Sequence, residues 1–99
     1  MPTVKAAYEA VLLFSLSKGE EAATALKEKF QELIAQHAEP GDIDDWGKRK
    51  LAYLIDDEAE GWYVLYNFVS GAAFPAELER VSGITDGVLR SMVVRKNEG

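Results

Sequence analysis

The residues that could carry chemistry in this chain gather in one stretch, GKRKLAYLIDDEAEGWYVLYNF, residues 47–68. It opens with three consecutive cations, continues with four acidic residues within five positions, and ends in a run of aromatic residues. Such cations could bind phosphate groups, clustered carboxylates could hold a hard metal ion, and aromatic rings could stack on bases or pack on a partner protein. Each chemistry needs a particular geometry, which the surrounding elements must supply.

The acidic residues favour a solvated hairpin tip over a metal site. Asp56, Asp57, Glu58 and Glu60 lack the alternating ligand pattern and the central glycine of a calcium loop. The single histidine, His37, has no cysteine beside which to form a zinc site, because the chain contains none. The sequence also lacks a P-loop, a dinucleotide fingerprint and a nucleophile elbow. We therefore predict no catalytic residue and no metal site.

The three cations have two interpretations, which the sequence leaves open. Successive side chains of a strand point to opposite faces, so Arg49 should point away from Lys48 and Lys50. Cations on an edge strand can prevent sheets from pairing edge to edge, or they can contact phosphate. Further cations at positions 90, 95 and 96 slightly favour phosphate contact.

The net charge of -6 argues against a protein that binds nucleic acid through a broadly basic surface. Residues 1–45 carry four lysines against nine acidic residues, whereas the chain from Trp62 onward carries four cations against four acidic residues. The acidity thus belongs mainly to the N-terminal half, and a local basic face remains possible elsewhere.

The length of 99 residues, 47% of them hydrophobic, predicts a single domain over residues 1–99, with frayed ends at about 1–5 and 97–99. No apolar run approaches the roughly 20 residues of a membrane-spanning helix, and the N-terminus lacks the pattern of a secretory signal. We therefore expect a cytoplasmic protein.

The hydrophobic pattern predicts six elements. Residues 8–16 and 61–70 are typical of strands that are apolar on both faces, as expected at the centre of a sheet. Ser17 followed by Glu20 predicts a capping box, and apolar residues at helical spacing continue to His37. A turn at 39–42 should end this helix, and Gly61 should close the hairpin tip. The remaining elements are a strand over 43–55, a helix over 71–83 with Pro75 in its first turn, and a strand over 88–96.

These elements follow the order β-α-β-β-α-β, which is that of the α+β ferredoxin-like sandwich. The sheet should be four-stranded and antiparallel, with both helices on one face and with the first and third strands at its centre. The second and fourth strands then form opposite edges, so their cations need not make one patch. Apolar side chains on the uncovered face must either tolerate water or meet a partner.

Four segments of the chain resemble a known family, ribosomal protein S6 of the bacterial small ribosomal subunit. The block GKRKLAY followed by Ile55 is similar to the second strand of that family, with Leu54 where the family usually has proline. The other segments are Tyr8-Glu9 in the first strand, Gly61-Trp62-Tyr63 in the third, and Arg90, Val93, Val94 and Arg95 in the last. The resemblance spans nearly the whole chain and implies the ferredoxin-like fold.

The resemblance implies a structural protein, without catalysis or cofactor, that pairs with ribosomal protein S18 and docks on the central domain of small-subunit ribosomal RNA. The residues it implies for RNA contact are Arg49 and Arg90 first, then Lys50, Arg95 and Lys48. Those it implies for the protein partner are Tyr53, Trp62 and Tyr63. Several family members carry more cations near the N-terminus than the single Lys5 of this chain, which weakens the case for RNA contacts at that end.

An acidic protein can bind RNA when a basic partner neutralises its acidic side while a few cations reach phosphates. We therefore predict weak RNA binding by the isolated chain and tighter binding by the heterodimer. The alternative is a ferredoxin-like ligand-sensing or homo-oligomeric interaction module, in which the uncovered face buries against a second copy of the chain.

Overall fold

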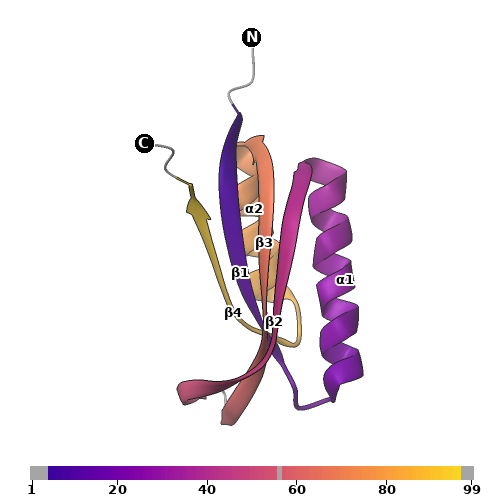
Figure 1. Ribbon diagram of the computed structural model, residues 1–99, viewed down its shortest axis with the longest axis vertical. Helices are drawn as coiled ribbons and strands as arrows, with labels where there is room; N and C mark the ends of the chain where they lie inside the picture. Colours follow the sequence, from indigo (N-terminus) through magenta and orange to yellow (C-terminus); the bar gives the residue numbers. More distant parts are fainter. Residues whose placement is uncertain (1–4, 56, 97–99) are drawn as a thin grey trace.

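A four-stranded antiparallel sheet and two helices follow one another in the predicted order (Figure 1). The computed structural model describes residues 5–55 and 57–96. Its elements are β1 (Lys5–Ser15), α1 (Glu20–His37), β2 (Glu39–Ile55), β3 (Glu58–Gly71), α2 (Ala73–Ile84) and β4 (Val88–Arg95). The strand order β2-β3-β1-β4 confirms that the first and third strands are central and that the second and fourth are opposite edges. Most of the predicted frayed ends lie outside the described residues, although Lys5 already belongs to β1.

Alternate residues of the two central strands build the core against the helices. One row of β1 and the facing row of β3 are buried together with the apolar residues that recur at helical spacing in α1 and α2. The largest buried side chains are Tyr66, Phe14, Phe30 and Phe68. The helices cover this face, and α2 lies behind the sheet in Figure 1. The other face, which we call the open face, is turned toward the viewer.

The start of α1 differs from the predicted capping box. The helix begins at Glu20, its N-cap is Gly19 with φ at +92°, and among the described residues no side chain caps it. The Ser17 hydroxyl instead lies 2.8 Å from the Ser15 hydroxyl, and the Ser17 amide donates to the same Ser15 oxygen. The capping-box prediction was wrong because a nearer hydroxyl engages Ser17 before the chain turns into the helix.

The predicted turn at 39–42 is part of β2. Glu39 pairs with Val69 and Pro40 with Phe68, and the register then shifts before Ile43 pairs with Tyr66. A proline is compatible with this position because β2 is an edge strand.

The hairpin between β2 and β3 is tighter than predicted. Strand β3 begins at Glu58, so Gly61 lies inside the strand and not at the tip, and the positive φ falls on Asp57. Gly61 is needed for space, because a Cβ there would collide with the side chain of Leu13. The solvated-tip prediction is also wrong for Glu58, whose carboxylate accepts from the Ser15 hydroxyl at 2.8 Å and from the Leu16 amide at 3.2 Å. Asp56 lies outside the described residues.

The ladder between β2 and β3 is interrupted near the hairpin. Lys50 pairs with Glu60, and pairing resumes only where Ile55 meets Glu58. Residues 51–54 therefore lie opposite a single β3 residue, and we call them the strap. Figure 1 shows this end of β2 and β3 curving away from α1, toward the side of the sheet where β4 lies.

Candidate nucleic-acid and partner interface

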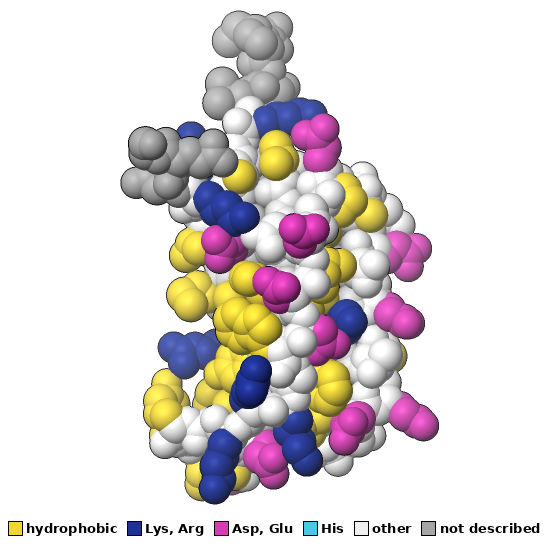
Figure 2. Space-filling view, in the orientation of Figure 1, with side chains coloured by type: hydrophobic (Ala, Val, Ile, Leu, Met, Phe, Trp, Pro, Cys, Tyr) yellow, Lys and Arg dark blue, Asp and Glu magenta, His cyan; other side chains and the backbone are white. Residues whose placement is uncertain are grey.

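The open face combines apolar side chains with cations. Strand register places Leu13 between Arg90 of β4 and Tyr63 of β3, and Val11 between Met92 and Leu65. In the lower half of Figure 2, dark blue Lys and Arg side chains surround a yellow hydrophobic area, whereas magenta acidic side chains follow the edge over α1. Acidic side chains thus line the α1 edge of the molecule, and others lie on the open face among the cations.

A hollow of about 200 Å³ lies on this face, lined by Val11, Leu13, Tyr63, Arg90 and Met92. Its floor is apolar, and Leu13 is only 1% exposed although no helix covers it. Met92 at 55% and Val94 at 46% are among the most exposed large hydrophobic residues of the described chain. Trp46 packs against Tyr63 with ring centroids 6.0 Å apart and extends the apolar area toward β2. Such a surface is typical of a partner-binding site.

The three consecutive cations divide between the two sides of β2, as predicted. Arg49 pairs with Gly61, which shares the open face with Tyr63, whereas Lys48 pairs with Trp62 on the helix-covered face. Lys48 also approaches Glu60, with Nζ 3.9 Å from the carboxylate. Arg49 and Lys50 form no ion pair with any described residue. Arg49 is therefore the cation of this group that the open face can offer to an anion.

The cations of β4 divide in the same way. Arg90 pairs with Leu13 on the open face, whereas Arg95 pairs with Tyr8, which faces the helices. Arg90 reaches across the face and donates from Nη1 to the Tyr53 hydroxyl of the strap at 2.9 Å. No sequence pattern predicts this contact, because it joins opposite edges of the sheet through an irregular segment of β2.

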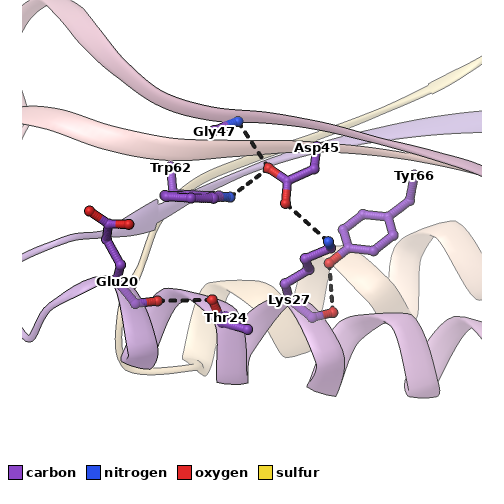
Figure 3. Close-up of polar contacts among 7 residues, drawn as sticks. All are labelled: Glu20, Thr24, Lys27, Asp45, Gly47, Trp62 and Tyr66. Atoms are coloured by element: carbon purple, nitrogen blue, oxygen red, sulfur yellow. Dashed lines mark hydrogen bonds and ion pairs between the residues drawn. The ribbon is translucent and has the colours of Figure 1, made fainter.

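The three predicted partner residues do not lie together. Tyr53 is 62% exposed on the strap, and Tyr63 lines the hollow on the open face. Trp62 points to the helix-covered face, where its indole Nε1 donates to Asp45 at 2.7 Å (Figure 3). The predicted contact of Trp62 with a protein partner stays untested. The indole Nε1, which is the polar atom of this side chain, already donates to Asp45.

Asp45 is the centre of a polar cluster that ties β2 to α1 and β3. Its carboxylate accepts from Lys27 Nζ at 3.0 Å, from the Gly47 amide at 2.9 Å and from Trp62 (Figure 3). Burial alone would raise the pKa of Asp45, but the hydrogen bonds from Lys27, Gly47 and Trp62 outweigh it and lower that pKa. An aspartate two residues before a glycine is a known turn signal, which could have indicated the bond to Gly47.

Tyr66 supports the same cluster from the core. Its hydroxyl donates to the backbone carbonyl of Lys27 at 2.8 Å, and burial raises its pKa, with a smaller contribution from the negative charge of Asp45. The tyrosine therefore stays neutral and holds the middle of α1 against β3.

The described residues show no group of side chains that could hold a metal ion and no helix that could span a membrane. Within residues 5–55 and 57–96, no three ligating side chains are grouped so as to hold a metal ion. Neither described helix is long and apolar enough to cross a bilayer.

Comparison with known proteins identifies relatives over nearly the whole chain. A family model described as Ribosomal protein S6 matches residues 7–95, from the third residue of β1 to the end of β4. The small ribosomal subunit protein bS6 of Thermoanaerobacter pseudethanolicus is 49% identical over 92 residues, which are 92% of this chain and 97% of that protein. The bS6 protein of Clostridium perfringens is 44% identical over the same shares.

A solved structure shares the fold. The crystal structure of the 30S ribosomal protein S6 from Thermotoga maritima matches with a TM-score of 0.87 and covers 94% of this chain and 89% of that one. At 24% sequence identity, this likeness supports the ferredoxin-like architecture alone.

Proposed function

The chain belongs to the ribosomal protein S6 family, and from this premise we propose that it binds the central domain of small-subunit ribosomal RNA as a heterodimer with ribosomal protein S18. As a small-subunit ribosomal protein it is structural and not enzymatic. Its place is then the ribosome.

The observation that carries the proposal is the composition of the open face. This face joins an apolar surface, centred on the hollow, to two arginines from opposite edges, Arg49 and Arg90. Apolar area suits a protein partner, and guanidinium groups that form no ion pair with a described residue suit phosphate, which they can bind through two parallel hydrogen bonds. One face can therefore serve a protein and an RNA together.

The RNA contacts of the proposal rest first on Arg49 and Arg90. Lys50 and Arg95 follow, since neither forms an ion pair with a described residue, and Lys48 comes last because Glu60 lies within 3.9 Å of it. Tyr53 and Tyr63 are the proposed contacts for the protein partner, together with Trp46 and Met92 beside them. Trp62 remains a weaker member of this set.

The proposal explains how an acidic protein can work on RNA. The acidic residues of α1 lie away from the open face and would repel phosphate if they faced it. A basic partner neutralises part of this charge and supplies further phosphate contacts. We therefore expect the heterodimer to bind a central-domain RNA transcript more tightly than the isolated chain. Equal affinity of the two would contradict the proposal.

A charge-matched pair of variants tests the open face directly. Arg49→Gln should weaken binding of the heterodimer to the central-domain transcript about five-fold, since one phosphate contact is lost. Lys29→Gln removes the same charge from α1 and should leave affinity unchanged, because Lys29 lies on the helix-covered side. Equal losses in the two variants would show that net charge, and not the open face, decides binding.

The proposed partnership is tested separately by mass measurement in solution. Size-exclusion chromatography with light scattering should show a monomer that forms a one-to-one complex with ribosomal protein S18. A stable homodimer that ignores S18 would favour the alternative, in which the open face buries against a second copy. Retention on small ribosomal subunits after a high-salt wash checks the role as a whole.

A further inference from the structure

The hydrogen bond between Tyr53 and Arg90 joins the two edge strands across the open face. Arg90 lies on β4 and Tyr53 on β2, which stand at opposite ends of the strand order. A regular β2 would keep Tyr53 beside β3. The interrupted ladder over the strap frees Tyr53 to reach Arg90 Nη1 at 2.9 Å.

We propose that Tyr53 is a positioning residue that holds the Arg90 guanidinium over the hollow and presents its remaining donors to an RNA phosphate. The inference rests on the proposed function, since it takes Arg90 as an RNA contact. In this inference the strap brings the Tyr53 hydroxyl from the β2 edge of the sheet to Arg90 on the β4 edge.

The choice of a hydroxyl acceptor matters for the charge of Arg90. Lys96 and Lys5 lie within 4 Å of carboxylates, which offset their charge. A hydroxyl acceptor carries no carboxylate charge and here occupies a single donor, so it does not offset the charge of the guanidinium. The Nε and Nη2 groups, which can donate to two oxygens of one phosphate, donate to no described residue.

Holding the Arg90 side chain in place should increase its affinity for phosphate, because a free arginine side chain is flexible. Ordering it on binding costs conformational entropy, and a contact that orders it beforehand removes part of that cost. The apolar floor of the hollow, including Leu13 and Met92, keeps water from one side of the guanidinium. A charge beside an apolar floor also interacts more strongly with an incoming anion than it would in bulk water.

Four variants test the inference by affinity for a central-domain RNA transcript, measured with S18 present over a range of salt concentrations. Arg90→Gln should weaken binding about ten-fold and lower the salt dependence by about one ion, because a phosphate contact is lost. Tyr53→Phe should weaken binding about three-fold without changing the salt dependence, because the contact remains but is less well ordered. The double variant should bind like Arg90→Gln. Tyr8→Phe, which removes a hydroxyl from the far end of β1, should bind like the parent.

The mobility of Arg90 gives a second measurement that a general loss of stability would not change. In ¹⁵N relaxation experiments on the free protein, the Arg90 Nε–H group should be ordered in the parent and in Tyr8→Phe, and mobile in Tyr53→Phe. Equal mobility in all three would overturn the inference.

The outcomes separate this inference from the proposed function. If Arg90→Gln weakens binding and Tyr53→Phe does not, the proposed function stands and positioning by Tyr53 is wrong. If Tyr53→Phe binds more tightly than the parent, Tyr53 masks Arg90, and the inference is again wrong. If Arg90→Gln binds like the parent, Arg90 is no RNA contact, and both the inference and that part of the proposed function fail.

Discussion

The longer part of β2, residues 39–50, pairs with β3 and is tied to α1 through Asp45, whereas the strap that follows leaves β3 and is tied to β4 through Tyr53. Asp45 accepts three hydrogen bonds, and two of its donors come from other elements. Tyr53 makes one side-chain bond and is 62% exposed. One strand thus contains a segment fixed to the body and a segment held lightly at the surface.

The contrast between these two segments of β2 indicates that different residues of the strand stabilise the fold and bind a partner. The bonds that hold residues 39–50 converge on one carboxylate at the helix-covered side, so that a change at Asp45 removes three of them together. The bond that holds the strap lies on the open face, where water can replace it. We therefore expect substitutions in residues 39–50 to act on folding and substitutions in the strap to act on binding.

The largest effect is expected from removing the Asp45 carboxylate. Asp45→Ala should lower the free energy of unfolding by about 2 kcal/mol, because the Trp62 indole and the Gly47 amide lose an acceptor and Lys27 loses its partner. Urea denaturation followed by tryptophan fluorescence measures this change. Asp44→Ala is the matched control, since the neighbouring Asp44 is exposed and makes no side-chain bond to a described residue; an equal loss there would contradict the assignment.

A smaller effect is expected from protonating Asp45. Its pKa is lowered in the folded protein, so it adds stability above its unfolded pKa of about 3.9, and this contribution is lost as the pH falls through the folded pKa. Asp45→Asn carries no such charge. The stability difference between the parent and Asp45→Asn should therefore be largest above about pH 5 and shrink toward pH 3. A constant difference over this range would show that the charge of Asp45 does not matter.

A substitution in the strap should have almost no effect on the free energy of unfolding. The backbone amides of the strap should nevertheless exchange faster than those of the paired part of β2. Amides of residues 51–54 lack ladder partners on β3, so we expect them to exchange with deuterium much faster than those of the paired residues 43–50. Tyr53→Phe should change the free energy of unfolding by less than about 0.5 kcal/mol. Protection of the strap equal to that of β1 would remove the contrast between the strap and the rest of β2.

The sequence predicted the parts of this molecule that depend on regular periodicity. Alternation on the first and third strands identified the two central strands, and the same rule separated Arg49 from its two neighbours. These predictions succeeded because successive side chains of a paired strand point to opposite faces of the sheet.

The remaining features depend on breaks in that periodicity. The sequence predicts Gly61 as a turn residue, whereas the structure needs it to leave room for Leu13. Glycine alone does not distinguish the two uses. The contact of Tyr53 with Arg90 needs a ladder that stops at Lys50 and a hairpin that bends across the sheet. No local pattern encodes such a crossing, since it joins residues that neither periodicity nor pairing brings together.

Glu58 gives the hairpin a mechanical property. Its carboxylate fastens the first residue of β3 to Ser15 and Leu16, at the junction between β1 and α1. A force applied to the strap by a bound RNA or protein would reach this junction before it reached the aromatic core. The hairpin is therefore fastened at the start of β3, so that a pull on the strap is resisted at Glu58 and the sheet behind it keeps its shape.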